Sequence, residues 1–131
     1  SNTFHAEIGL RIHEGGTPYV FVRRRAGDLA ADVFLAAHPG GAVRLEISGD
    51  WDFVRFAWAA GDGPLIGVAQ AERRFFCTEV AGGWTGCVLG LYAQGQGRTC
   101  AKPAAFASFD YERRALPEGS AYPWPETDIA F

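Results

Sequence analysis

The chain has 131 residues, the size of a single domain with room for a proper hydrophobic core. Its 17 glycines, its 14% aromatic content and its lack of methionine favour a turn-rich β protein over a helical bundle. A formal net charge of −3 argues against a nucleic-acid or anionic-membrane partner. The sequence also contains no apolar run long enough to cross a bilayer.

The three cysteines, Cys77, Cys87 and Cys100, form an odd set without Cys-x-x-Cys spacing. This pattern indicates thiols in a reducing compartment, so we expect a cytoplasmic location. A Cys87–Cys100 disulfide is the alternative interpretation. Ser1-Asn2 resembles a remnant of an expression vector, so the natural N-terminus is expected to differ from this one.

Short runs in which apolar and polar residues alternate, separated by glycine and proline turns, predict strands along the first half of the chain. Residues 29–37 are ambiguous, because their alanines would also suit a helix. A short helical turn is expected over residues 72–79. The predicted strands cover residues 3–13, 19–25, 29–37, 43–47, 51–59 and 65–68.

The second half is organised around a glycine-hinged aromatic tip. Gly82 and Gly83 permit a tight turn that can hold Trp84 outward. The apolar run at residues 87–93 then predicts a buried strand, and residues 103–112 predict a second, alternating strand. Trp51 and Trp58, in the first half, are predicted to lie in the core or on a strand face.

Eight or nine short strands with regular turns are typical of a sandwich or a barrel. We therefore expect one β domain over residues 1–114. Residues 115–131 are rich in proline and aromatic residues and are expected to form an extended tail, with Trp124 as its anchor.

Three motifs near the end of the predicted domain carry a family resemblance. Residues 82–86 read Gly-Gly-Trp-Thr-Gly, residues 90–93 read Gly-Leu-Tyr-Ala, and residues 103–111 read Pro-Ala-Ala-Phe-Ala-Ser-Phe-Asp-Tyr. Together they resemble the end of the concanavalin A-like C-terminal domain of glycoside hydrolase family 43 β-xylosidases. Residues 40–47 and 54–63 are similar to the preceding strands, so the resemblance covers roughly residues 4–113.

The resemblance implies an all-β concanavalin A-like sandwich, or jelly roll, that lacks the first strands of the family domain. A sheet edge would then be exposed unless a partner or a second copy covers it, and a homo-oligomer is expected. The chain departs from the family at Ala105 and Ala107, where aspartates are usual, and at Trp84, where phenylalanine is usual. The missing aspartates argue against a bound calcium ion, and no other cofactor is expected.

In this family the catalytic carboxylates lie in a separate N-terminal β-propeller. The resemblance therefore implies an accessory role in xylan degradation, without catalysis by this chain. Its aromatic loop, with Gly83, Trp84 and Thr85 as the candidate substrate-binding residues, would help to wall the sugar pocket of a β-xylosidase or α-L-arabinofuranosidase. The expected partners are that propeller and a xylo- or arabino-oligosaccharide.

Two other functions fit parts of the sequence. An autonomous carbohydrate-binding module would need a platform of exposed aromatic side chains, for which Trp84, Tyr92 and Trp124 are candidates. A small free-standing enzyme would need two carboxylates flanking one bond, whereas the acidic residues here, such as Asp50 and Asp62, lie mostly in turns where they cap their own backbone. Trp84 could also be a rim residue that packs on its own sandwich.

Overall fold

The computed structural model describes residues 4–13, 15–82, 88–95, 97–101 and 103–113. They fall into two compact units, which divide after residue 87, and each is described by itself. The first unit contains all the strands and helices in the described part of the chain. The second, beginning at Val88, contains neither.

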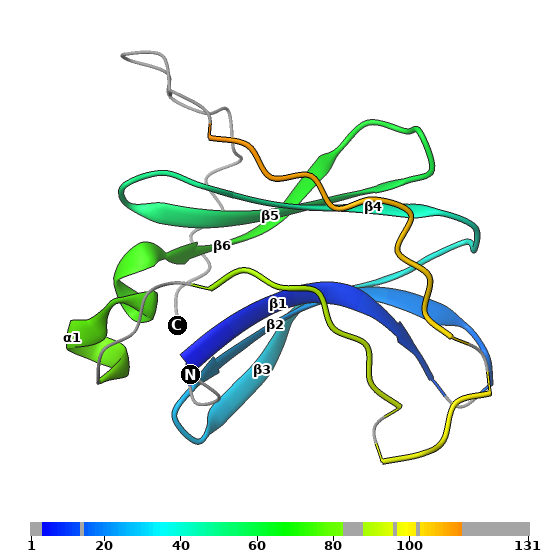
Figure 1. The fold of residues 1–131 in the computed structure, drawn as a ribbon, viewed down its shortest axis with the longest axis horizontal. Coiled ribbons are helices and arrows are strands. Elements are labelled where there is room, and N and C mark those ends of the chain that lie inside the picture. Colours follow the sequence, from blue (N-terminus) through cyan, green and yellow to red (C-terminus); the bar gives the residue numbers. More distant parts are fainter. Residues whose placement is uncertain (1–3, 14, 83–87, 96, 102, 114–131) are drawn as a thin grey trace. The chain divides into compact units, whose positions relative to one another are not determined.

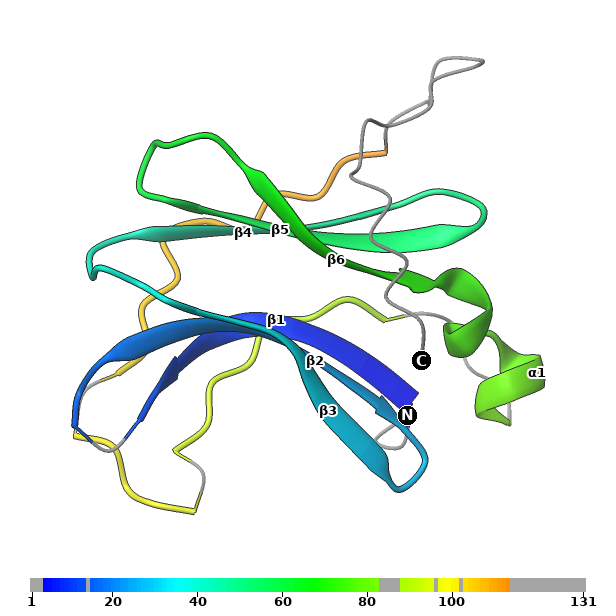
Figure 2. The ribbon, with the colours of Figure 1, turned by 180° about the vertical axis from the view of Figure 1, so that it is seen from behind.

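The first unit is a sandwich of two antiparallel sheets, each with three strands (Figures 1 and 2). The strand order is β1-β2-β3 in one sheet and β4-β5-β6 in the other, and β1 contacts β4 while β3 contacts β6. The prediction of an all-β sandwich is thereby confirmed, and so is the strand assignment of the ambiguous residues 29–37. The strands are β1 (Phe4–Ile12), β2 (Pro18–Ala26), β3 (Leu29–Ala37), β4 (Val43–Gly49), β5 (Phe53–Ala60) and β6 (Ile66–Glu72).

The core lies between the two sheets and is centred on one aromatic ring. Phe56 of β5 is 1% exposed and packs with Val22 of β2, which is fully buried. Ala69 and Ala71 of β6 complete the buried cluster, and Ala69 is the register partner of Phe56. Small side chains beside a large ring keep the packing dense without forcing the sheets apart.

The outer face of the first sheet is more polar than the inner face that lines the core, but it also holds a buried aromatic ring. Phe21 of β2 is only 7% exposed and lies against Gly9 of β1, where an added Cβ would be 3.1 Å from the ring. The guanidinium of Arg11 lies 4.2 Å from the centre of the Phe21 ring. Asp32 of β3 accepts hydrogen bonds from Arg11 at 2.9 Å and from Arg23 at 2.7 Å. These contacts join all three strands of the sheet.

A short helical segment follows β6, as expected for residues 72–79. It consists of the 3₁₀ helix η1 (Arg73–Phe76) and the helical turn α1 (Thr78–Ala81). Phe76 packs against the core cluster and so anchors the segment to the sandwich. In the part of the chain that the structure describes, no helix is long and apolar enough to cross a membrane.

The two strands predicted after the aromatic loop are not strands in the described structure. Residues 88–95 and 103–113 have no ladder pairing, and Val88, expected to be buried, is 88% exposed. Phe106 and Phe109 are also more than half exposed. A strand requires a neighbouring backbone for its hydrogen bonds, and an apolar or alternating pattern does not supply that neighbour.

The contact between Gly9 and Phe21 can be tested by a double-mutant cycle. Gly9→Ala should destabilise the sandwich by about 1 kcal/mol, because the new methyl group crowds the Phe21 ring. In a Phe21→Leu background the added penalty of Gly9→Ala should largely disappear, since the shorter side chain leaves room. Urea unfolding of the four variants measures both values, and equal penalties in the two backgrounds would contradict this explanation.

Candidate functional site

The residues singled out by the sequence, Gly83, Trp84 and Thr85, lie outside the described residues. The segment leading to them is described. The helical turn α1 ends at Gly82, whose N–H donates to the carbonyl of Thr78 at 2.9 Å. Gly82 has a φ of 71°, a value that favours glycine over other residues. Gly82 thus adopts the glycine-favoured backbone angle expected of it, and the predicted tight turn through Gly83 lies outside the described residues.

The aromatic platform considered for a carbohydrate-binding module is described only in part. Tyr92 is 55% exposed in the second unit, whereas Trp84 and Trp124 lie outside the described residues. Trp58 is half-buried in β5, as predicted, with its ring edge-to-face with His38 at a centroid distance of 5.9 Å. His38 itself is 3% exposed.

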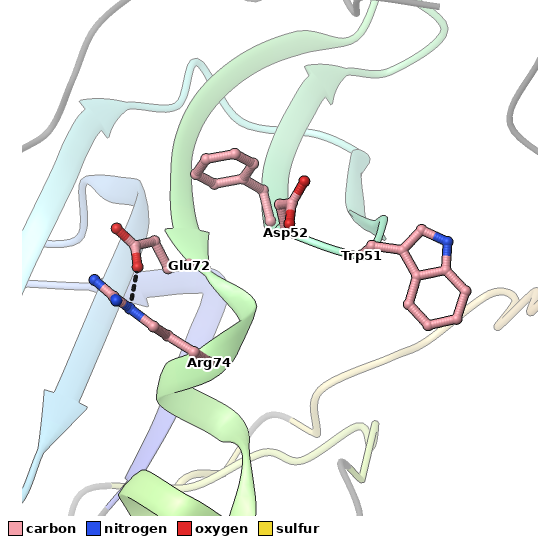
Figure 3. A pocket seen from close by; sticks show the side chains of 5 residues that line it. Trp51, Asp52, Glu72 and Arg74 are labelled. Atoms are coloured by element: carbon pink, nitrogen blue, oxygen red, sulfur yellow. Dashed lines mark ion pairs between the residues drawn. The ribbon is translucent and has the colours of Figure 1, made fainter. Parts of the chain in front are cut away.

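Trp51 contradicts the prediction that it belongs to the core or to a strand face. Its side chain is 84% exposed, at the tip of the hairpin that joins β4 to β5. The strand β5 begins only at Phe53, so Trp51 belongs to the turn and not to the alternating pattern. Figure 3 shows its indole pointing away from the ribbon. The signal that could have placed it there is Gly49-Asp50 immediately before it, a turn-forming pair.

The side chain of Asp50 holds this turn in place. One carboxylate oxygen accepts hydrogen bonds from the backbone N–H groups of Asp52, at 2.8 Å, and Phe53, at 2.7 Å. The other oxygen accepts a hydrogen bond from the guanidinium of Arg55. An aspartate that bonds to the backbone two and three residues ahead sets the course of a turn, and the arginine fixes the aspartate. Trp51 is therefore displayed on a well-supported tip.

A backbone hydrogen bond links the hairpin tip to the helical segment. The N–H of Arg73, the first residue of η1, donates to the carbonyl of Asp52 at 2.7 Å. The guanidinium of Arg73 also lies over the Trp51 ring, 5.4 Å from its centre. This cation–π contact orients the indole while leaving most of it accessible.

Between the hairpin tip and the end of β6 lies a hollow of about 340 Å³. Glu72 and Arg74 form an ion pair on its wall, and in the view of Figure 3 Asp52 lies between this pair and Trp51. The hollow thus combines an exposed indole with two carboxylates and a guanidinium. Its lining residues are Trp51, Asp52, Phe53, Glu72 and Arg74.

Two carboxylates outside this lining carry shifted pKa values. Burial raises the pKa of Asp50, but the hydrogen bonds from Arg55, Phe53 and Asp52 outweigh it and bring the pKa below the usual range. Burial likewise raises the pKa of Asp32, but the hydrogen bonds from Arg23 and Arg11 outweigh burial and bring this pKa below the usual range as well. Both carboxylates are therefore held ionised by structural contacts.

A catalytic role for these two carboxylates does not follow from their contacts. Each is held by hydrogen bonds within its own sheet or turn. Glycoside hydrolysis needs a pair of carboxyl groups, one on each side of the bond to be cleaved. Across residues 4–113, apart from the short gaps, no group of three or more His, Cys, Asp and Glu side chains is placed to hold a metal ion.

A comparison with protein families finds one that matches most of the chain. The model of the β-xylosidase C-terminal concanavalin A-like domain matches residues 1–112. No significant match was found among curated proteins or among solved structures.

The turn built by Asp50 gives a prediction about acid stability. Since the folded state lowers the pKa of Asp50, its ionised carboxylate stabilises the fold above the ordinary aspartate pKa of 3.8, and this contribution is lost as the pH falls below that value. Asp50→Asn should cost on the order of 1–2 kcal/mol at pH 7 and should flatten the acid dependence of unfolding. Asp50→Ala should cost more, because the backbone N–H groups also lose their acceptor.

Urea unfolding at a series of pH values between 7 and the acid transition measures both effects. Asp62→Asn, in the turn between β5 and β6, is the matched control and should leave the pH dependence as it is. An unchanged acid slope in Asp50→Asn would show that the carboxylate is not held as described.

Proposed function

The chain belongs to the family of β-xylosidase C-terminal concanavalin A-like domains, and on this basis we propose that it completes the sugar pocket of a family 43 glycosidase with its aromatic loop. Domains of this family are non-catalytic accessory domains that accompany an N-terminal catalytic domain. The family match over residues 1–112 is the observation that carries the proposal. The parent enzyme would be a β-xylosidase or an α-L-arabinofuranosidase that takes part in xylan degradation.

The described structure supports the proposed role of the loop through the segment that precedes it. Phe76 anchors η1 to the core, and α1 ends at Gly82 with a positive φ. The loop therefore starts from an anchored element, two residues before Trp84 in the sequence. A loop that starts from a fixed base can present one large side chain to a neighbouring domain at low entropic cost.

In the proposed mechanism Gly83, Trp84 and Thr85 bind substrate and take no part in bond cleavage. The indole of Trp84 would cover one side of the sugar and exclude water from the pocket, which strengthens the electrostatic interactions of the catalytic carboxylates. It could also stack on the apolar face of the sugar ring. The two carboxylates that cleave the bond would both come from the propeller.

The edges of the sandwich support a role in assembly. Leu10 and Ile12 on β1 are 42% and 72% exposed, and Leu45 and Ile47 on β4 are 37% and 40% exposed. Because β1 and β4 are the first strands of their sheets and contact each other, these side chains lie along one edge of the sandwich. Exposed apolar edges favour contact with another chain or domain, here the propeller or a second copy.

The 131-residue chain alone should not hydrolyse aryl xylosides or aryl arabinosides. The carboxylates of Asp32 and Asp50 accept hydrogen bonds that hold the sheet and the turn in place. In the proposed mechanism the reaction needs the paired carboxyl groups of the propeller. Release of the aryl alcohol measures activity, with the parent enzyme as the positive control. Turnover that persists through purification and disappears on mutating one acidic residue of this chain would overturn the accessory role.

In the parent enzyme, Trp84→Ala should lower kcat/KM roughly ten- to a hundredfold without unfolding the protein, because one stacking or shielding contact is lost. Trp84→Phe restores an aromatic ring and should retain most of the activity. Steady-state kinetics and the melting temperature are measured together. A lower melting temperature with unchanged kinetics would instead identify Trp84 as a residue that packs on its own sandwich.

A further inference from the structure

We propose that the hollow beside Trp51 is a second sugar-binding site, which holds a neutral oligosaccharide with one pyranose ring stacked on the exposed indole. The site consists of the indole of Trp51 as a stacking surface and of Asp52, Glu72 and Arg74 as hydrogen-bonding groups. It does not depend on the proposed role of Trp84, since every lining residue lies on β5, β6, η1 or the hairpin tip.

The exposed indole is the first reason. An 84% exposed tryptophan presents a large flat apolar surface that a ligand can cover. Arg73 lies over the ring and orients it, while most of the side chain stays exposed. The apolar C–H face of a pyranose ring fits a flat aromatic surface of this kind.

The rigidity of the site is the second reason. The hairpin tip is fixed by the hydrogen bonds of Asp50, and it is tied to η1 by the bond from the Arg73 N–H to the Asp52 carbonyl. The helical segment η1 is in turn anchored to the core by Phe76. Ligand binding to a surface whose parts are already in place loses little conformational entropy.

The polar groups select the class of ligand. Asp52 and Glu72 contribute two negative charges around the hollow, and Arg73 and Arg74 contribute two positive charges, so their formal sum is zero. This balance favours a neutral ligand over an anionic polymer such as a nucleic acid. Carboxylate oxygens accept hydrogen bonds from sugar hydroxyls, and the guanidinium of Arg74 donates to them.

The size of the hollow agrees with a small ligand. Its volume of about 340 Å³ is at the lower end of the range of roughly 300–1,000 Å³ that is usual for small-molecule sites. With one aromatic surface and an open side, the site should bind with a Kd of about 1 mM. A site this weak increases the overall affinity when the same oligosaccharide is also bound at a second site, because the second binding step is then intramolecular.

The test is a titration of the ¹⁵N-labelled 131-residue chain with xylohexaose, followed through the tryptophan indole N–H signals by NMR. The signal of Trp51, identified by its loss in Trp51→Phe, should shift saturably. Trp51→Ala should weaken binding roughly tenfold or more, and Trp51→Phe should weaken it less because a ring remains. Asp52→Asn should also weaken binding, because an amide oxygen is a poorer acceptor than a carboxylate.

Tyr111→Ala removes another exposed aromatic side chain, 75% exposed and in the second unit, and should leave the affinity unchanged. Because Trp51 is exposed, its variants should keep the wild-type melting temperature, so a loss of binding cannot be attributed to unfolding.

Three results would overturn the proposal. The first is the lack of a saturable shift at sugar concentrations about tenfold above the expected Kd. The second is binding of equal strength in Trp51→Ala. The third is a Trp51→Ala variant that binds sugar normally but associates more weakly with the separately produced catalytic propeller, which would assign Trp51 to a protein interface.

Discussion

The packing of Phe56 between the two sheets is the constraint on which the rest of the structure depends. Its ring is 1% exposed and contacts Val22 of the opposite sheet, so it holds the two three-stranded layers together. Full burial of such a side chain contributes about 1.5–3 kcal/mol, a large share of what a small sandwich of two three-stranded sheets can gain. Alanines at positions 69 and 71 leave space for the ring.

The same packing determines the geometry at the end of the sandwich. Phe56 fixes the course of β5, and β5 begins directly after the turn that carries Trp51. Phe76, which packs against the same core, fixes η1 and with it the guanidinium of Arg73. The relative position of Trp51 and Arg73 therefore follows from the buried ring of Phe56 and the partly buried ring of Phe76, and the hydrogen bond between Arg73 and Asp52 completes the connection.

The carboxylates with resolved partners work as structural groups. Asp32 joins Arg11 and Arg23 across three strands, Asp50 shapes a turn, and Glu72 pairs with Arg74 at the end of β6. The exposed Glu72–Arg74 pair adds little stability, whereas the contacts of the more buried Asp32 and Asp50 fix strand register and turn geometry. This use of acidic residues agrees with a family of non-catalytic accessory domains.

The sequence alone was sufficient to predict six strands, the helical segment after residue 72 and the family. These predictions rest on alternation, on glycine turns and on the motifs that begin at Gly82, all of which are local properties of the chain. It could not predict that residues 88–93 and 103–112 lack strand pairing, since pairing needs a neighbouring backbone that no local pattern specifies. It also misplaced Trp51. The alternating pattern extended that residue's strand by two positions, whereas the hydrogen bonds of Asp50 keep these positions in the turn and leave the indole exposed. Burial of an aromatic side chain is decided by the elements that pack around it, and only the tertiary structure brings those together.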